Sequence, residues 1–395
     1  MNDIRVGVVG IGNIGSMHAT NLYSKKIKGA SLAAVCDIDP QKKVWAKEHL
    51  KGVEFFDSFE QMITSGKIDA VIASVPHPLH PVVAECGFKN GLHVLSEKPI
   101  GVTTKSAEKL NEIAEKSGKV FVVMHNQRVN PVFNKAREIF KGGEIGELVR
   151  FVWIITNWYR LQQYYESSAW RATWKGEGGG VLANQCPHNI DIMQWIVGVP
   201  KKVKGNCKYG KYHDIEVEDD VTAYFEFENG ASGVFISSTG ENPGTNHLEI
   251  SGTKGKMILE DGKIRLWKTD IPEPEYRYFS NEEYAEKVKF KYEELVLPQL
   301  PYGEEHIAIV QNFINAISKG EKLISPGIEG INGLTISNAI HLSDWTGETV
   351  EIPFDSEEHE RLLNERIKKS TKRNTTQQDD SIHMGEMSSR WEVKW

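Results

Sequence analysis

The residues with the plainest chemical potential form a glycine-rich turn near the start of the chain. Gly10, Gly12 and Gly15, together with Asn13 and Ile14, make the pattern G-x-G-x-x-G directly after an apolar run. Such glycines let the backbone approach a pyrophosphate, and the helix that follows directs free N–H groups at the phosphates. An ordinary turn is the alternative for the motif taken alone. Its place between an expected strand and an expected helix favours dinucleotide binding.

An acidic residue supports this interpretation. Asp37 ends the second expected strand, 22 residues after Gly15, where a carboxylate can accept hydrogen bonds from both ribose hydroxyls. The alternative is a turn residue in the segment Asp37–Pro40. Because a carboxylate at this place repels a 2′-phosphate, the sequence predicts NAD in preference to NADP.

Two loops beyond later strands carry further polar residues, and ligands of doubly wound sheets bind beyond the carboxyl ends of the strands. The H-x-x-H spacing of His77 and His80 could suggest a metal, but Pro78 interrupts helical geometry and the nearest carboxylate in sequence is Glu85. We therefore expect no metal here, and a loop that closes over the nicotinamide. The cofactor-binding candidates from these segments are Ser74, Pro76, His77, His80, Glu97, Lys98 and Asn126.

Lys98 is also a candidate for contact with a substrate. Most lysines are exposed ammonium groups, which is the alternative here. At the tip of a cofactor-binding sheet, however, a lysine can donate to a substrate hydroxyl and stabilise developing alkoxide charge.

Three motifs together carry a family resemblance. The glycine turn, the Glu97-Lys98-Pro99 loop and the later Gly178–Gly180 run followed by His188 resemble the Gfo/Idh/MocA oxidoreductases, over roughly residues 4 to 355. That family includes inositol and sugar dehydrogenases. The resemblance implies a Rossmann domain and a second α/β domain whose open antiparallel sheet forms a homodimer or homotetramer.

His188 lies in a segment that we expect to be one helix, Val181–Val197. Asn184, His188 and Asp191 then share a face, at i, i+4 and i+7. The alternative is a core histidine whose hydrogen bonds are satisfied by Asp191 or by the main chain. The resemblance implies that His188 accepts the alcohol proton, a role that suits an imidazole. Many family members have aspartate where this chain has Asn184, which can orient a hydroxyl but not act as a base, so His188 and Lys98 become the expected catalytic pair.

Residues 153–174 are rich in tryptophan and tyrosine, with Arg160 and Arg171 among them. Aromatic faces suit the C–H faces of a pyranose or cyclitol, and arginines suit hydroxyls. A core or interface cluster is the alternative. The substrate-binding candidates are Lys98, Trp158, Arg160, Trp170, Arg171, Asn184, His188 and, from the polar loop 209–220, His213.

The elements that would position these residues follow two patterns. Strand and helix signals alternate over residues 4–125, which predicts parallel βαβ units. Glu228–Ala231 and Glu260–Lys263 then contain Asn-Gly and Asp-Gly, typical of type I′ hairpin turns in which both central residues have positive φ. Apolar periodicity predicts a further helix over 304–319. The expected strands of the first half are Ile4–Val9, Leu32–Cys36, Ala70–Val75, His93–Leu95 and Val120–Met124.

The fold class predicted is α/β, with a doubly wound parallel sheet followed by a domain with a large open, mainly antiparallel sheet. The expected domains are a Rossmann NAD-binding domain over 1–125, a substrate-binding and oligomerisation domain over 126–355, and a polar C-terminal tail or arm over 356–395.

Composition excludes several classes of protein. The 395 residues are 39% hydrophobic and 26% charged, with a net charge of −7. This suits a globular protein and offers no basic footprint for nucleic acid. No apolar stretch approaches the roughly 18 residues of a membrane span, and no signal peptide is evident. The four cysteines are scattered, so we expect reduced thiols and a cytoplasmic location.

The sequence thus predicts an NAD-dependent oxidoreductase acting on a ring carbinol of a sugar, glycoside or cyclitol. Position 3 of a glucoside is suggested by the resemblance only. A glycosidase that retains its NAD and oxidises the sugar transiently is one alternative. A non-catalytic NAD-binding regulator is the other, and such proteins usually lack the lysine–histidine pair.

Overall fold

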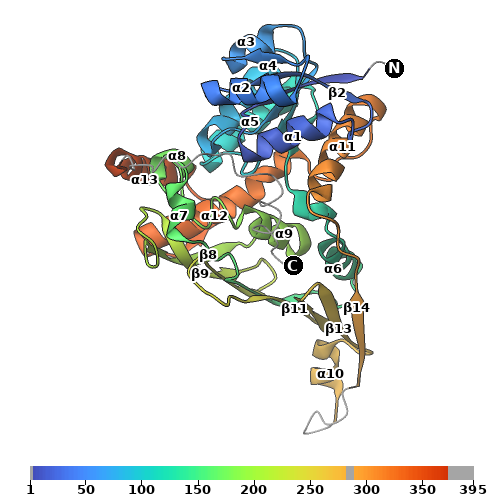
Figure 1. The fold of residues 1–395 in the computed structure, drawn as a ribbon. Coiled ribbons are helices and arrows are strands. Elements are labelled where there is room, and N and C mark those ends of the chain that lie inside the picture. Colours follow the sequence, from blue (N-terminus) through green and yellow to red (C-terminus); the bar gives the residue numbers. More distant parts are fainter. Residues whose placement is uncertain (1–2, 282–288, 372–395) are drawn as a thin grey trace. The chain divides into compact units, whose positions relative to one another are not determined.

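The computed structural model describes residues 3–281 and 289–371 (Figure 1). The chain forms two compact units. Of the described residues, the first unit comprises 3–129, 176–178 and 303–334, and the second comprises 130–175, 179–281, 289–302 and 335–371. The domains were expected to be continuous, with residues 303–334 in the second. They pack instead with the first.

The first unit contains a six-stranded sheet in the order β3-β2-β1-β4-β5-β6, and every pairing in it is parallel. This confirms the predicted doubly wound sheet. The short strand β3 was not predicted, since three residues carry little periodicity. The strands are β1 (Ile4–Val9), β2 (Ala30–Cys36), β3 (Glu54–Phe56), β4 (Ala70–Ala73), β5 (His93–Ser96) and β6 (Phe121–Val123).

Helices cover both faces of this sheet because its strands are apolar on both sides. Along β4, Ala70 and Ile72 pack with one cluster and Val71 and Ala73 with the other. One face carries α1 (Asn13–Tyr23) and α2 (Pro40–His49), both seen near β2 in Figure 1, and α11 (Glu304–Lys319). The other face carries α3 (Phe59–Thr64), α4 (His80–Lys89) and α5 (Thr104–Ser117).

The predicted helix over 304–319 is confirmed as α11, and Gly320 ends it with a positive φ of 71°. Ile309, Val310, Phe313 and Ile314 are buried with β1 and α1 in the same cluster. This burial explains why the late segment belongs to the first unit. Periodicity showed the apolar face of the helix but not the sheet that the face covers.

The second unit is built on a nine-stranded sheet in the order β14-β13-β12-β11-β7-β10-β9-β8-β15. Among the described strands, every neighbouring pair is antiparallel except β7 with β10. This confirms the predicted mainly antiparallel sheet. The strands are β7 (Leu148–Ile155), β8 (Lys202–Tyr209), β9 (Glu218–Glu226), β10 (Ser232–Ser238), β11 (Asn246–Gly252), β12 (Gly255–Glu260), β13 (Lys263–Thr269), β14 (Phe290–Val296) and β15 (Val350–Glu351).

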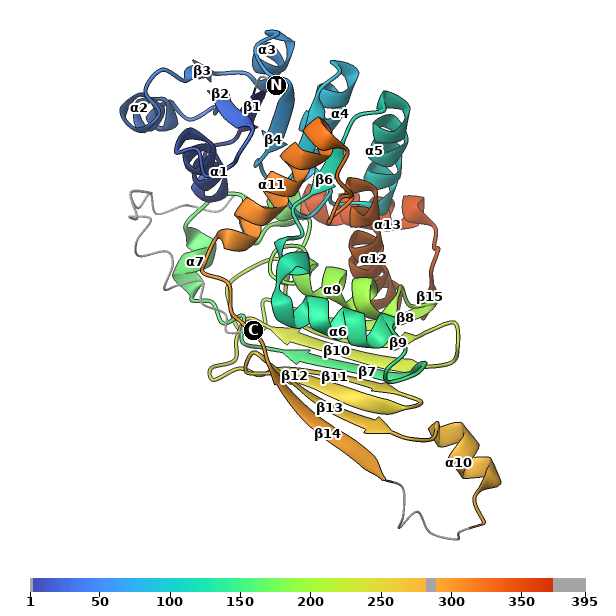
Figure 2. The ribbon, with the colours of Figure 1, turned by 90° about the vertical axis from the view of Figure 1, so that its right-hand side faces the viewer.

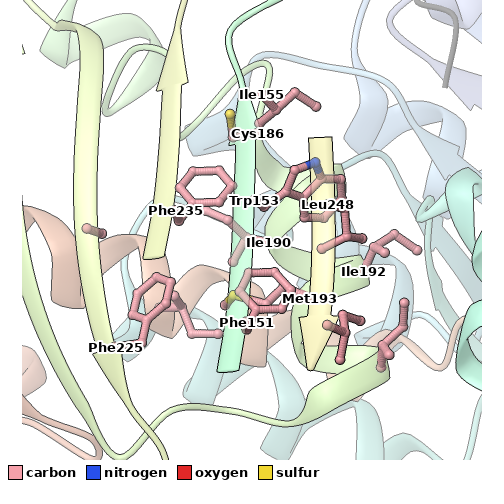
Figure 3. Packing of buried hydrophobic residues seen from close by; sticks show 14 of the residues in the cluster. Phe151, Trp153, Ile155, Cys186, Ile190, Ile192, Met193, Phe225, Phe235 and Leu248 are labelled. Atoms are coloured by element: carbon pink, nitrogen blue, oxygen red, sulfur yellow. The ribbon is translucent and has the colours of Figure 1, made fainter. Parts of the chain in front are cut away.

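Helices α6 (Pro131–Lys141) and α9 (Pro187–Val197) lie on one face of this sheet (Figure 2). Figure 3 shows the core between α9 and the sheet. Phe151 and Trp153 of β7 point at Ile190 and Met193 of the helix, with Phe235 of β10 beside them. The remaining helices are α7 (Gln162–Glu166), α8 (Trp174–Glu177), α10 (Glu273–Phe279), α12 (Gly330–Thr346) and α13 (Ser356–Lys369), with short 3-10 turns at His77–Leu79, Asn126–Val129 and Gly327–Glu329.

The two predicted hairpins both form, but with different turns. Asp261 and Gly262 have φ values of 53° and 74°, as a type I′ turn requires. In the other hairpin only Gly230 has a positive φ, of 81°, so a type I′ turn is wrong there. The Asn229 side chain accepts the Ala231 N–H at 3.1 Å and donates to the Leu148 carbonyl at 2.8 Å, which stabilises a longer loop.

The segment expected to be a polar tail begins with helix α13. The Asp355 carboxylate caps its N-terminus, and His359 and Leu363 are buried. An amphipathic stripe in a charge-rich helix was therefore missed. The rest of the expected tail, from residue 372, lies outside the described residues. No helix in the described part of the chain is long and apolar enough to span a membrane.

Candidate functional site

The glycine turn of the first unit has the shape that a nucleotide cradle needs. Gly10 has a φ of 79°, and a Cβ there would lie 2.3 Å from the Ser74 carbonyl oxygen. A Cβ on Gly15 would lie 1.7 Å from the Gly10 oxygen, whereas one on Gly12 would meet nothing within 4 Å. The first and third glycines therefore serve close packing. The second leaves open space beside the N-terminus of α1, where a pyrophosphate would lie.

Asp37 is held by the same turn. Its Oδ2 accepts the Ile11 N–H at 2.7 Å, and its Oδ1 accepts the Asp39 N–H at 2.9 Å. Each carboxylate oxygen can accept more than one hydrogen bond. The carboxylate is thus fixed beside the cradle with capacity for ribose hydroxyls, so the residues fit a dinucleotide.

The sheet gathers all the predicted cofactor-binding residues at one edge. They follow the carboxyl ends of parallel strands, and the strand order reverses direction beside β1, where doubly wound sheets bind ligands. These residues are Gly10, Gly12, Asn13, Ile14 and Gly15 after β1, Asp37 after β2, Ser74, Pro76, His77 and His80 after β4, Glu97 and Lys98 at the end of β5, and Asn126 after β6.

Glu97 is the electrostatic centre of this edge. It is buried, and its Oε1 accepts a hydrogen bond from His18 Nε2 at 2.9 Å, while its Oε2 accepts the Lys98 N–H at 3.3 Å. Burial alone would raise the pKa of Glu97, but the His18 hydrogen bond and the charges of His18, His306 and Lys98 outweigh it and lower the pKa. An ionised carboxylate therefore underlies the loop that carries Lys98, whose side chain is half-buried.

Sequence reasoning missed both histidines near Glu97. His18 could have been found, because it follows the glycine turn by one helical turn. His306 comes from α11, and no local pattern connects it to Glu97. Its ring centroid lies 6.0 Å from that of His18, and its Nδ1 lies 3.5 Å from the Asn126 side-chain nitrogen. Burial lowers the pKa of His306 to about 4, so the ring is neutral near neutrality.

His77 and His80 contact main-chain carbonyls. Nδ1 of His80 donates to the Pro99 oxygen at 2.7 Å, and Nδ1 of His77 lies 3.2 Å from the Glu177 oxygen. Both rings are buried, and burial lowers the pKa of His80. The pair therefore connects loops within the first unit. Within the described ranges, no group of three or more His, Cys, Asp or Glu side chains could hold a metal ion.

In the second unit, the helix that carries His188 is shorter than predicted. Helix α9 begins at Pro187, and residues 181–186 form turns. Proline suits the first helical position and disfavours helix in the residue before it. Asn184 therefore lies in the turn, where its N–H donates to the Gly180 oxygen at 2.9 Å. The expected single helical face through Asn184 and His188 is wrong, although both residues remain in one short segment.

Two predicted arginines meet at Tyr164. The Arg160 guanidinium lies 5.1 Å and the Arg171 guanidinium 4.6 Å from the Tyr164 ring centroid, and Arg171 Nη1 donates to the Tyr164 hydroxyl at 2.8 Å. Trp170 lies 4.6 Å from the Arg171 guanidinium. Gln185 of the histidine turn donates to the same hydroxyl at 3.4 Å. Arg160, Trp170 and Arg171 are thus grouped beside the turn that carries Asn184.

Trp158 and His213 are engaged within the protein. Trp158 is only 5% exposed and belongs to the core, and its indole N–H donates to the Asn189 oxygen at 3.2 Å. The ring nitrogens of His213 lie 3.1 Å from Asp219 Oδ2 and 2.9 Å from the Arg160 carbonyl oxygen. Trp158 is therefore bound to a residue of α9, and His213 is bound to the main chain of Arg160.

Two protein-family models match this chain. Residues 4–125 match the oxidoreductase family with an NAD-binding Rossmann fold, and residues 133–258 match the GFO/IDH/MocA C-terminal domain. The chain belongs to the Gfo/Idh/MocA family. The predicted family is thereby confirmed, and with it the NAD-binding Rossmann fold of the first unit.

Several relatives of this Gfo/Idh/MocA protein are named for cyclitol oxidation. Inositol 2-dehydrogenase of Corynebacterium glutamicum strain R is 26% identical over 58% of this chain. That match spans 64% of the relative, less than two thirds of its length. The NAD⁺-dependent scyllo-inositol 2-dehydrogenase of Bacillus subtilis strain 168 is also 26% identical, over 89% of this chain and 97% of the relative.

A solved structure similar to this chain is the WlbA dehydrogenase of Bordetella pertussis in complex with NADH and UDP-GlcNAcA. It superposes with a TM-score of 0.75 at 25% identity, over 90% of this chain and all of that one. The similarity therefore extends through both units of the fold.

Proposed function

We propose that this Gfo/Idh/MocA protein is an NAD-dependent oxidoreductase that transfers hydride between a ring carbinol of a sugar, glycoside or cyclitol and nicotinamide. The observation that carries the proposal is one edge of the first unit, which presents a nucleotide cradle, the Asp37 carboxylate and the Lys98 side chain together. The substrate class is supported by the inositol dehydrogenases among the relatives and by the sugar nucleotide bound to the WlbA dehydrogenase.

The chemistry that NAD supplies when bound is acceptance of hydride from the carbinol carbon. The residues of the chain bind, orient and move the proton. Lys98 donates a hydrogen bond to the substrate hydroxyl and stabilises negative charge on its oxygen as the proton leaves. The ionised Glu97 beneath the loop balances the lysine charge and holds the Lys98 N–H.

His188 accepts the hydroxyl proton, directly or through water, because a neutral imidazole is a suitable base near neutral pH. Asn184 orients the ring by hydrogen bonding without holding charge. Trp170 and Arg171 supply an aromatic face and a fork of donors for the ring hydroxyls. That Lys98 and His188 act on the same hydroxyl rests on the family resemblance of the two motifs.

Two further properties belong to the proposal. NAD is preferred over NADP because the Asp37 carboxylate would repel a 2′-phosphate. A homodimer or homotetramer forms through the sheet of the second unit. The second property is supported by apolar side chains on sheet residues such as Val149 and Tyr224, which are 46% and 43% exposed.

The test is a panel of sugars, glycosides and inositols assayed for NADH formation, with the Lys98→Ala protein as the inactive control. Net NADH formation that the control lacks supports the proposal, and a glucoside oxidised at position 3 would refine it. Cleavage of a glycoside without net NADH formation would instead establish the NAD-retaining glycosidase. Tight NAD binding without any reaction across the panel would favour the regulator.

A further inference from the structure

Three main-chain amides of the turn that carries Asn184 bind one buried residue, Glu218, at the start of β9. Glu218 is 0% exposed. Its Oε1 accepts the N–H groups of Gly180 at 2.8 Å and Leu182 at 3.1 Å. Its main-chain oxygen accepts the N–H of Val181, between them, at 2.9 Å. One residue thus satisfies three consecutive amides of the turn.

The glycines make this attachment possible. A Cβ on Gly180 would lie 2.0 Å from the Glu218 main-chain oxygen, and a Cβ on Gly179 would lie 3.0 Å from His341 Cε1. Any other residue at position 180 would push the turn away from Glu218. Gly180 therefore permits the close approach of the Glu218 main chain, and Gly179 leaves room for the Glu218 carboxylate and His341 beside the turn.

Hydrogen bonds continue from the attached amides to the helix. The Asn184 N–H donates to the Gly180 oxygen at 2.9 Å, and the Cys186 N–H donates to the Val181 oxygen at 2.8 Å. The Ile190 N–H then donates to the Cys186 oxygen at 2.9 Å. The segment that carries Asn184 and His188 is therefore hydrogen-bonded to Glu218 at its N-terminal end.

The second carboxylate oxygen faces a histidine. Glu218 Oε2 lies 3.2 Å from Nε2 of His341, which is also buried. The His341 ring stacks on Trp345 at 5.2 Å, and Trp345 stacks on His359 of α13 at 5.2 Å. A buried carboxylate is costly without partners. His341 lies within ion-pair distance of Oε2, although the two atoms are not aligned for a hydrogen bond, and α13 contributes to the ring stack that holds His341 in place.

We propose that Glu218 is a positioning residue for the reaction, which fixes the turn so that Asn184 and His188 meet the substrate in one orientation. This inference rests on the proposed function. It assigns no contact between Glu218 and the substrate, because the carboxylate acts only through the turn. His341 is its supporting partner.

The experiment compares Glu218→Ala with Glu218→Gln. Alanine removes both acceptors of the side chain, so we expect kcat to fall at least tenfold, the affinity for NAD to stay unchanged, and the amides of residues 180–182 to exchange hydrogen faster. Glutamine keeps a carbonyl oxygen for the same two amides at nearly the same side-chain length. We expect glutamine to restore most of the turnover and the amide protection.

Glu216→Ala is the matched control. Glu216 precedes Glu218 by two residues and accepts hydrogen bonds from the Ser370 hydroxyl and the Thr371 N–H, at 2.6 Å each. The hydrogen bonds of its carboxylate within the described residues go to Trp174, Ser370 and Thr371 rather than to the glycine turn, so turnover and exchange at residues 180–182 should match the wild type. Were the alanine protein at position 218 unable to fold, Glu218→Asp replaces it, because the shorter side chain cannot reach both amides.

The outcomes separate the two proposals. Loss of turnover and of amide protection in Glu218→Ala, with rescue by glutamine, supports positioning. Wild-type turnover in Glu218→Ala or Glu218→Asp overturns it, as does a loss that Glu216→Ala shares. A wild-type protein that oxidises no compound of the panel overturns the proposed function. Faster exchange in the variant would then still establish the attachment of the turn.

Discussion

Each unit contains a buried carboxylate next to a buried histidine, and the two pairs differ in what they hold. In the first unit His18 lies 2.9 Å from Glu97, which directly precedes Lys98 in the chain. In the second unit His341 lies 3.2 Å from Glu218. Glu218 lies at the start of β9 and binds the turn that leads to Asn184 and His188. Glu97 thus belongs to the motif that it supports, whereas Glu218 is remote in sequence from the turn that it supports.

The difference follows from the two kinds of sheet. Parallel strands all end at one edge, so a motif at a strand end is positioned by the strand itself. The open antiparallel sheet has no such shared edge, and its turn needs an anchor from elsewhere. In the first unit Lys98 is therefore positioned by the strand that it follows, whereas in the second unit the turn of Asn184 is held by a contact with another strand.

The largest effects should come from removing one proposed catalytic residue in each unit. Lys98→Ala and His188→Ala should each lower kcat by about 10²–10⁴, the usual value of a general acid–base group, with little change in NAD affinity. The double variant should lose much less than the product, because groups acting as a unit are not additive. Steady-state oxidation of the best panel substrate measures turnover, and protein fluorescence measures NAD binding.

Lys98→Arg should also lower kcat strongly, because a planar guanidinium does not replace a compact ammonium in a fitted site. Near wild-type turnover in Lys98→Ala would contradict the mechanism and favour the regulator. Independent, multiplicative losses in the double variant would mean that the two units contribute to different steps.

The next effect tests the carboxylate of the first unit by stability. Glu97→Gln should lower the free energy of unfolding at neutral pH by about 3 kcal/mol, the cost of breaking a buried pair. Because the folded-state pKa of Glu97 is lowered, its contribution is present above the ordinary pKa of 4.5 and is lost as pH falls through the folded value. Urea unfolding should therefore show a weaker acid dependence in the variant.

Glu85→Gln is the control for this measurement. Glu85 pairs with Lys89 and Lys109 at the surface of the same unit. An exposed pair contributes about 0–1 kcal/mol. Equal destabilisation by the two substitutions would show that the buried position of Glu97 does not increase its contribution to the free energy of unfolding.

A smaller effect concerns cofactor choice at the edge of the first unit. Asp37→Ala should weaken NAD binding by about 1–3 kcal/mol, as expected for loss of a charged hydrogen-bond partner, and NADP should gain relative to NAD. Asp37→Asn serves as control, since an amide oxygen can still accept the Ile11 N–H while the charge is gone. Equal loss for both cofactors in titrations would exclude contact between Asp37 and the ribose.

The smallest effect should appear in a pH profile of the second unit. Asn184→Asp changes the side-chain volume little but adds a negative charge near His188 in the chain, and a nearby negative charge favours the imidazolium. The acidic limb of kcat/KM should then move to higher pH. If the two profiles coincide, the side chains of residues 184 and 188 do not face each other.

Much of the first unit could be predicted because its signals are local. The glycine turn, Asp37 and the strand-end loops lie where the apolar strands end, and parallel pairing brings them together without further information. His306 could not be predicted as a neighbour of Glu97, since α11 shows only that it has an apolar face. In the second unit, Pro187 marked the true start of α9 in the sequence, but the predicted helix began at Val181 and did not take this proline into account.

By itself, the sequence determined the fold class, the family, the cradle and the residue types available for catalysis, because these depend on short motifs and on periodicity. Only the tertiary structure decided that residues 303–334 return to the first unit, that His18 and His306 surround Glu97, and that Glu218 holds the turn of Asn184. The physical reason is that buried charges and main-chain amides find their partners through space. Those partners come from segments whose own sequences carry no mark of the contact.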